Sequence, residues 1–174
     1  SKLSSKEQEV HLSITAIAAG GNSSFCLTDT GTAFSWGENQ HGQLGHGDTN
    51  LRSNPVSIQA FVDVGVRVEN ICCSGDCTAA VSTAGNVYTW GQIRNQDQQL
   101  NRSDYQYFSS HSSENMMTCE LAPRLVELFA AKNLRIAGVW AGRGNQFISA
   151  IQSLNANRRN EKAMRMHIGT NNGI

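Results

Sequence analysis

The chain has 174 residues, and its 14 Lys and Arg balance 14 Asp and Glu, so the formal net charge is zero. A neutral chain has no global positive field, which argues against nucleic acid or an anionic membrane as its main partner. Only 16% of the residues are charged, while glycine occurs 16 times among abundant serine and asparagine. This turn-prone mixture favours many short strands and argues against a helical bundle or a coiled coil. No stretch of the sequence approaches the ~18 apolar residues of a membrane span.

A β-hairpin is the first element that the residues predict. Two short runs rich in strand-forming residues, 24–27 and 33–36, are joined through a turn that contains Gly31. We expect Gly31 to take a positive φ, which a β-carbon would penalise. A second hairpin with the same chemistry follows over residues 79–90, and Gly85 takes the place of Gly31 in its turn.

The two hairpins belong to a sequence repeat. Residues 17–37 read IAAGGNSSFCLTDTGTAFSWG and residues 71–91 read ICCSGDCTAAVSTAGNVYTWG, and the two segments align without a gap. Glycine and tryptophan coincide in register, which is stronger evidence than the number of identities alone. The repeat predicts structural roles for Gly21, Gly31, Trp36, Gly37, Gly75, Gly85, Trp90 and Gly91.

A third copy of the repeat begins at residues 136–148, and a strand led by proline recurs at Pro55 and Pro123. One such unit cannot bury its faces alone, and radial stacking of four-stranded units of about 40–50 residues is the propeller solution. We therefore expect Trp36 and Trp90 to occupy equivalent positions one blade apart and to pack between blades.

Residues 36–47, which read WGENQHGQLGHG, resemble the repeat of the regulator of chromosome condensation family. The first copy matches every element of that repeat, including Gly42 and Gly45 of its Gly-Gln-Leu-Gly segment, whereas the second copy departs after Gly91. The resemblance implies an all-β fold of antiparallel four-stranded propeller blades, about two blades and part of a third from a seven-bladed propeller. The chain is then a fragment of a longer protein, a product that closes a ring by oligomerising, or a small open stack.

The resemblance covers residues 14–151 and sets the predicted organisation of the chain. Residues 121–133 have helix-like spacing, but their proline-led start predicts a short strand plus a turn. We interpret the basic tail, residues 152–174, as a solvated segment and not as a site for nucleic acid or a phosphoinositide. The predicted segments are an N-terminal flank at 1–13, repeats at 14–67, 68–135 and 136–151, an insertion at 92–122 within the second repeat, and the polar, basic tail at 152–174.

The insertion is the predicted partner-binding surface. It is polar overall, yet residues 102–108 concentrate three aromatic side chains. Arginine and aromatic residues are favoured where binding energy concentrates. The alternative is a surface loop without a function. The residues expected to contact a protein partner are Arg94, Arg102, Tyr105, Tyr107 and Phe108.

No catalytic residue, cofactor or metal site is predicted. His41, His46 and Asp48 lie close together in the sequence, but the family resemblance explains their segment as a connection within a blade. The cysteines are odd in number and have the spacing of neither a zinc site nor paired disulfides. We expect an intracellular protein, cytoplasmic or nuclear, in which five thiols are reduced: Cys26, Cys72, Cys73, Cys77 and Cys119.

The resemblance implies three functional contexts: nucleotide exchange on a small GTPase, recruitment in large HECT-type ubiquitin ligases, and scaffolding. We interpret the chain as a non-catalytic protein–protein interaction module of a larger regulatory or ubiquitin-ligase protein. Its expected partners are a small GTPase, a ubiquitination substrate or the remainder of its own propeller. A guanine-nucleotide exchange factor is the alternative, although fold alone does not establish that activity.

Overall fold

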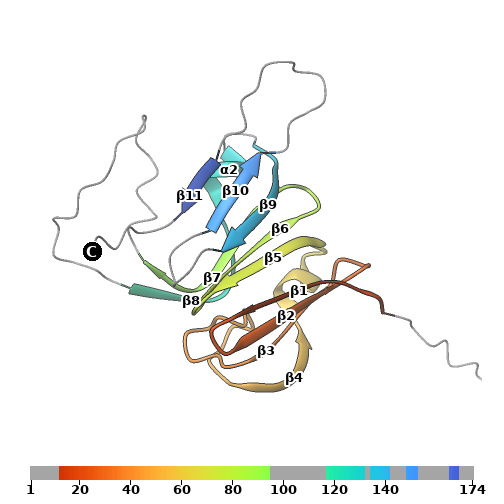
Figure 1. Ribbon diagram of the computed structural model, residues 1–174, viewed down its shortest axis with the longest axis vertical. Helices are drawn as coiled ribbons and strands as arrows, with labels where there is room; N and C mark the ends of the chain where they lie inside the picture. Colours follow the sequence, from red (N-terminus) through yellow and green to blue (C-terminus); the bar gives the residue numbers. More distant parts are fainter. Residues whose placement is uncertain (1–11, 95–116, 132–133, 142–147, 153–164, 169–174) are drawn as a thin grey trace, which may run out of the picture.

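The computed structural model describes residues 12–94, 117–131, 134–141, 148–152 and 165–168. Its strands form two four-stranded antiparallel sheets and one three-stranded sheet. The sheets fan out side by side, with β5 lying between β1 and β9 (Figure 1). Within these described residues, no helix is long and apolar enough to cross a membrane.

Each sheet is built from strands that follow one another in the chain. The first sheet contains β1 (Ile14–Gly20), β2 (Ser23–Thr28), β3 (Ala33–Gly37) and β4 (Arg52–Ser57). The helix α1 (Gln59–Asp63) leads to the second sheet, which contains β5 (Val68–Ser74), β6 (Cys77–Ser82), β7 (Val87–Arg94) and β8 (Met117–Leu125). The helix α2 (Glu127–Ala131) leads to the third sheet, which contains β9 (Ile136–Ala141), β10 (Ile148–Gln152) and β11 (Arg165–Ile168).

The first two sheets repeat each other even in their irregularities. The pairing of β1 with β2 shifts register after Ile14, and the pairing of β5 with β6 shifts after Val68, the equivalent position. The pairing of β3 with β4 shifts after Ser35, and that of β7 with β8 shifts after Thr89, which is again equivalent. The sequence repeat is therefore a repeat of four-stranded units, as the sequence predicts.

Each hairpin turn docks on the start of the next sheet. Gly31 and Gly85 have φ angles of 80° and 82°, so both take the positive φ expected of them. The Gly31 carbonyl accepts a hydrogen bond from the Val68 N–H at 2.8 Å, and the Gly85 carbonyl accepts one from the Ile136 N–H at 3.0 Å. The same joint therefore connects the first sheet to the second and the second to the third.

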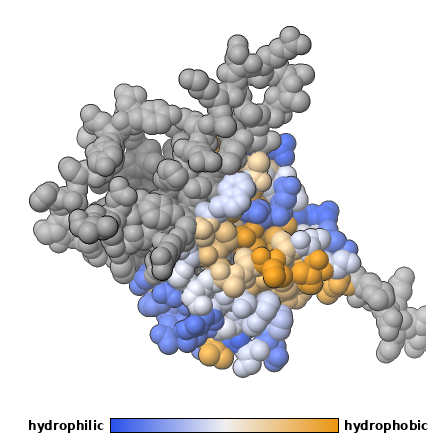
Figure 2. All heavy atoms as spheres, viewed as in Figure 1, coloured by the Kyte–Doolittle hydropathy of each residue, from blue (hydrophilic) through white to orange (hydrophobic). Residues whose placement is uncertain are grey.

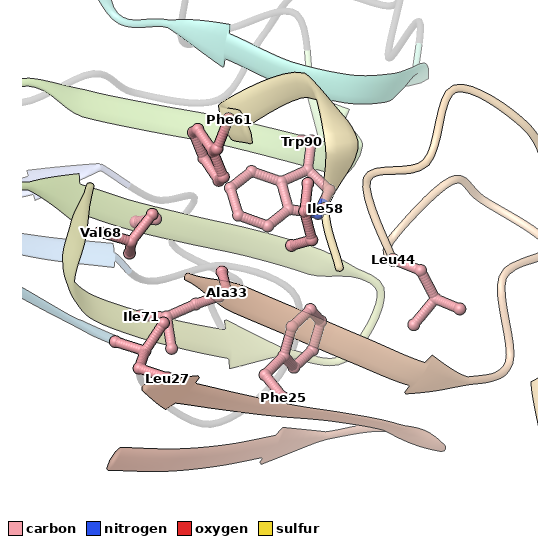
Figure 3. Packing of buried hydrophobic residues seen from close by; sticks show 10 residues of the cluster. Phe25, Leu27, Ala33, Leu44, Ile58, Phe61, Val68, Ile71 and Trp90 are labelled. Atoms are coloured by element: carbon pink, nitrogen blue, oxygen red, sulfur yellow. The ribbon is translucent and has the colours of Figure 1, made fainter. Parts of the chain in front are cut away.

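Apolar side chains fill the spaces between the sheets. Because successive residues of a strand point to opposite faces, Ala79 and Val81 of β6 face the third sheet while Ala80 faces the first. Figure 3 shows Trp90 beside Phe61 in the space between the first two sheets. The cluster between the first and second sheets comprises Phe25, Leu27, Ala33, Leu44, Ile58, Phe61, Val68, Ile71, Ala80 and Trp90. The cluster between the second and third comprises Cys77, Ala79, Val81, Val87, Phe129, Ile136 and Val139.

Three features differ from the sequence-based expectation. The proline-led strand at Pro123 is present within β8, but the predicted turn after it is the helix α2, which places Phe129 in the core at 1% exposure. The third sheet includes β11, which lies in the segment predicted to be a tail. Strands also enter both ends of the predicted insertion, since β7 continues to Arg94 and β8 begins at Met117. Residues 95–116 lie outside the described part.

Candidate interaction surface

The connection from β3 to β4 joins the first sheet to the second. The Gln43 carbonyl accepts hydrogen bonds from the Trp90 indole Nε1 at 2.8 Å and from the Thr78 hydroxyl at 2.9 Å. Gly45 permits this approach, because a β-carbon there would lie 2.8 Å from Trp90 Nε1. Trp90 is 0% exposed and Gln43 is 2% exposed. The junction is thus held by buried hydrogen bonds, whose loss would leave polar groups unsatisfied in the interior.

The loop that carries Gln43 is ordered by its own side chains. Asn39 donates through Nδ2 to the Asp48 carbonyl at 2.8 Å and accepts the Leu44 N–H at 2.9 Å. Arg52 forms an ion pair with Asp48 at 2.7 Å, and its hydrogen bonds hold the pKa of Asp48 well below the usual range. These contacts present Gln43 to the second sheet in one geometry.

His46 attaches the same loop to β3. The Ser35 hydroxyl lies 2.8 Å from the Leu44 carbonyl and 2.9 Å from His46 Nε2. A hydroxyl has one hydrogen, so when Ser35 donates to the carbonyl, His46 Nε2 donates to Ser35. Burial, and then the positive charge of Arg52, lower the pKa of His46. The imidazole is therefore neutral at neutral pH.

The face of the first sheet that points away from the second sheet, called the outer face below, carries apolar residues. The equivalent residues of the second sheet pack against the first sheet. Val68 and Ile71 of β5 are 3% and 7% exposed in the junction. Their equivalents in β1, Ile14 and Ile17, are 54% and 81% exposed. Figure 2 shows apolar residues gathered over β1, near the start of the described chain. An exposed apolar patch of this kind marks an interaction site.

Trp36 and Trp90 have equivalent registers and different surroundings. Trp36 pairs with Ser24 of β2, and Trp90 pairs with Thr78 of β6, so the predicted equivalence of position is confirmed. Trp90 is fully buried and lies edge-on to Phe61, with ring centroids 5.8 Å apart. Trp36 is only half-buried, and its indole forms no hydrogen bond with any residue that the structure describes. Within the described ranges no sheet covers the side of Trp36, so its packing between blades stays a prediction.

The partner-binding residues predicted from the sequence fall at the margin of the structure. Arg94 ends β7, where its backbone pairs with Met117. The other four, Arg102, Tyr105, Tyr107 and Phe108, lie outside the described residues. That surface stays a prediction.

The outer face, defined here by Ile14, Ile17 and Trp36, was not predicted. The signal was present in the sequence, because each of the three residues aligns with an apolar residue of the second copy. A repeat indicates which positions are equivalent. It does not indicate that one of two equivalent faces lacks a neighbour.

Metal ligation finds no support in the described ranges of the chain, where no group of three or more His, Cys, Asp or Glu side chains is arranged to hold an ion. His46 and Asp48 instead take part in the loop contacts given above.

Comparison with known proteins identifies the repeat. The regulator of chromosome condensation (RCC1) repeat is recognised over residues 30–81 and over residues 14–43. Human E3 ubiquitin-protein ligase HERC2 is 30% identical over 138 residues, which is 79% of this chain and 2% of HERC2. Ultraviolet-B receptor UVR8 of Arabidopsis thaliana is 42% identical over 78 residues, 45% of this chain and 17% of UVR8. Mouse protein RCC2 is 32% identical over 123 residues, 70% of this chain and 23% of RCC2.

Solved structures agree with the architecture. Human WBSCR16 superimposes with a TM-score of 0.61 at 22% identity, covering 88% of this chain and 37% of that one. Prp20p of Saccharomyces cerevisiae superimposes with a TM-score of 0.56 at 23% identity, covering 80% of this chain and 30% of Prp20p. The chain thus spans well under half of these structures, and the likeness shows the fold, a partial propeller. Residues 14–81 carry the regulator of chromosome condensation repeat, and this part of the chain belongs to the regulator of chromosome condensation repeat family.

Proposed function

We propose that this chain is a non-catalytic protein–protein interaction module that acts as stacked blades within a larger regulatory or ubiquitin-ligase protein of the cytoplasm or nucleus. The outer face of the first sheet is the observation that carries this proposal. Ile14 and Ile17 are largely exposed there, whereas the same positions of the second sheet are buried in the junction. Full burial of an isoleucine side chain contributes about 1.5–3 kcal/mol, so covering this face favours association.

Another blade of the same repeat type is the occupant that fits this face. In the junction between the two described blades, the Trp90 indole donates to a carbonyl of the Gly-Gln-Leu-Gly loop. Trp36 presents the same donor at the equivalent position. The Gly-Gln-Leu-Gly sequence occurs once in this chain, and its Gln43 carbonyl is already bound. A second copy has no free loop to offer, so the remainder of its own propeller is the favoured partner.

The relatives support protein binding as the general role. Human HERC2 is named as a ubiquitin ligase, and human HERC4, which is 43% identical over 75 residues, is named as a probable one. Prp20p was studied for its binding to Gsp1p and histones, and Prp20 was crystallised with Kap60 bound. A ubiquitination substrate or a small GTPase is accordingly the external partner that we propose for the completed propeller. Nucleotide exchange remains the alternative, and no contact among the described residues favours it.

The test of the interaction proposal supplies the missing blade. A copy of residues 12–65, with its own Trp36 changed to Phe, is inserted directly before residue 12 of the full chain, which preserves the repeat register. We expect acrylamide quenching of tryptophan fluorescence to fall, because the original Trp36 becomes buried, and the melting temperature to rise. Ile17→Asp in the receiving blade should abolish both effects.

A matched substitution controls for the charge itself. Val62→Asp places the same group on α1, where Val62 is 49% exposed and away from the outer face. This variant should retain both effects of the added blade. If Trp36 stays as accessible as before and the added blade leaves the melting temperature unchanged, the outer face does not bind a blade.

Exchange activity is measured separately. Release of labelled nucleotide from a purified small GTPase is followed with and without the chain. An unchanged release rate supports the interaction module, and a clear acceleration supports the alternative function.

A further inference from the structure

Three reactive side chains from distant parts of the sequence meet where the loop after β3 lies beside β8. His41 belongs to the loop, Asp76 to the turn between β5 and β6, and Cys119 to β8. His41 Nδ1 lies 3.9 Å from Cys119 Sγ, and His41 Nε2 lies 3.8 Å from Asp76 Oδ2. The imidazole therefore stands between a thiol and a carboxylate, with one ring nitrogen toward each.

A buried amide holds the backbone of His41 and the carboxylate of Asp76 in this arrangement. The His41 backbone N–H donates to Gln43 Oε1 at 2.9 Å, and Gln43 Nε2 donates to Asp76 Oδ1 at 3.2 Å. Gln43 itself is 2% exposed and is fixed through its carbonyl by Trp90. The contacts that order the junction between the first two sheets therefore also hold His41 and Asp76 in place.

A separate anchor holds the thiol near the loop. The Gly47 N–H donates to the Leu121 carbonyl at 2.8 Å, two residues along β8 from Cys119. β8 is itself paired with β7, where Cys119 lies opposite Gln92. The sulfur and the imidazole are therefore brought together by fixed backbone on both sides.

Cys119 differs from the other four cysteines in its access to solvent. Cys26 and Cys77 are buried, whereas Cys119 is exposed. Burial raises the pKa of Cys72 and of Cys73 to about 12, which keeps those thiols protonated and unreactive. The described structure thus contains one cysteine that combines solvent access with a neighbouring base.

We propose that Cys119 is a modification site, a nucleophilic thiol that takes small carbon electrophiles with His41 as its proton acceptor. The thiolate is the reacting form of cysteine, and an adjacent imidazole generates it. In the reaction with iodoacetamide, sulfur forms a bond to the methylene carbon, iodide leaves with the bonding electrons, and the thiol proton passes to His41 Nδ1. Asp76 is a positioning residue that orients the imidazole.

The test measures alkylation of the folded full chain by iodoacetamide, with each cysteine followed by peptide mass spectrometry. Cys119 should react first, with a rate constant about threefold or more above that of a synthetic peptide of residues 117–123, because only the folded chain places the His41 imidazole beside the thiol. His41→Gln should lower the rate to that of the peptide. Gln40→Ala, an exposed neighbour in the same loop, should leave it unchanged.

The positioning role of Asp76 has its own readout. Asp76→Asn should slow Cys119 while the other four cysteines keep their rates, and Asp76→Glu should restore the lost rate. If His41→Gln lowers the melting temperature strongly, the comparison of the wild-type chain with the peptide decides alone. The proposal is overturned if folded Cys119 reacts no faster than the peptide, or if a folded His41→Gln chain reacts as fast as the wild type.

Discussion

Trp90 joins two sheets through one atom, because its Nε1 donates to the Gln43 carbonyl 47 residues earlier in the chain. The same indole fills the space beside Phe61. Its equivalent Trp36 has the same register without either contact. Comparing the same substitution at the two tryptophans therefore shows how much of the stability comes from contacts in the junction and how much from a tryptophan side chain as such.

Trp90→Phe should destabilise the chain by about 2–4 kcal/mol, since it removes a buried hydrogen bond and leaves a cavity. Trp36→Phe is the matched control, and its cost should stay below about 1 kcal/mol because the side chain is half-exposed. Urea unfolding followed by circular dichroism gives both values. Equal losses for the two variants would mean that Trp90 is not a junction residue.

His46 should make stability depend on pH. Burial lowers its pKa in the folded chain from the ordinary value of 6.5. Below pH 6.5 the unfolded chain therefore binds a proton that the folded chain does not, so the free energy of unfolding falls as the pH drops through that value. Urea unfolding at about pH 7.5 and about pH 5.5 brackets this window. His46→Gln should lose less stability over the same interval, and an identical loss in both proteins would contradict the assignment.

At the scale of elements, the sequence predicts where the strands lie better than it predicts which sheets pack against each other. The hairpins are predictable because turn glycines such as Gly31 lie between alternating strand formers. The helix α2 is not, because its five residues are too few for the helix-like spacing around them to outweigh the strand signal of the preceding Pro123. The exposure of Ile17 is not predictable either, because the equivalent Ile71 is buried and only the presence of a neighbouring sheet distinguishes them. The Cys119–His41 contact joins residues 78 positions apart, beyond any local pattern.

The segment between β7 and β8 should be replaceable without loss of the fold. Arg94 and Met117 are paired across the two strands, so Asn-Gly in place of residues 95–116 gives a two-residue hairpin. The free energy of unfolding should rise by about 2 kcal/mol, because shortening the loop from 22 residues to two is about three and a half halvings of its length, at roughly 0.6 kcal/mol each. Urea unfolding measures this.

The same replacement tests the sequence-predicted binding residues. A partner that binds through Tyr105, Tyr107 and Phe108 should be lost from the shortened chain, and also from a full-length chain in which all three are serine. A shortened chain that unfolds would show that the segment contributes to the core.

At the scale of the whole molecule, one joint is used twice. The carbonyls of Gly31 and Gly85 each accept a backbone N–H from the next sheet. Stability in such a stack is the sum of each blade and its nearest-neighbour interfaces. The first sheet has one such interface among the described residues, which leaves Trp36 and Ile17 open. Trp36 and Trp90 therefore occupy equivalent positions of two neighbouring blades and differ in their exposure to solvent.

Hydrogen exchange at the indole N–H groups of the ¹⁵N-labelled chain tests that difference most directly. Trp90 Nε1–H should exchange at least about 100-fold more slowly than Trp36 Nε1–H, because it opens only when the junction with Gln43 opens. Gly45→Ala should bring the two rates closer together, since a β-carbon there displaces the indole. Equal exchange of Trp36 and Trp90 in the wild-type chain would contradict the stacked-blade account.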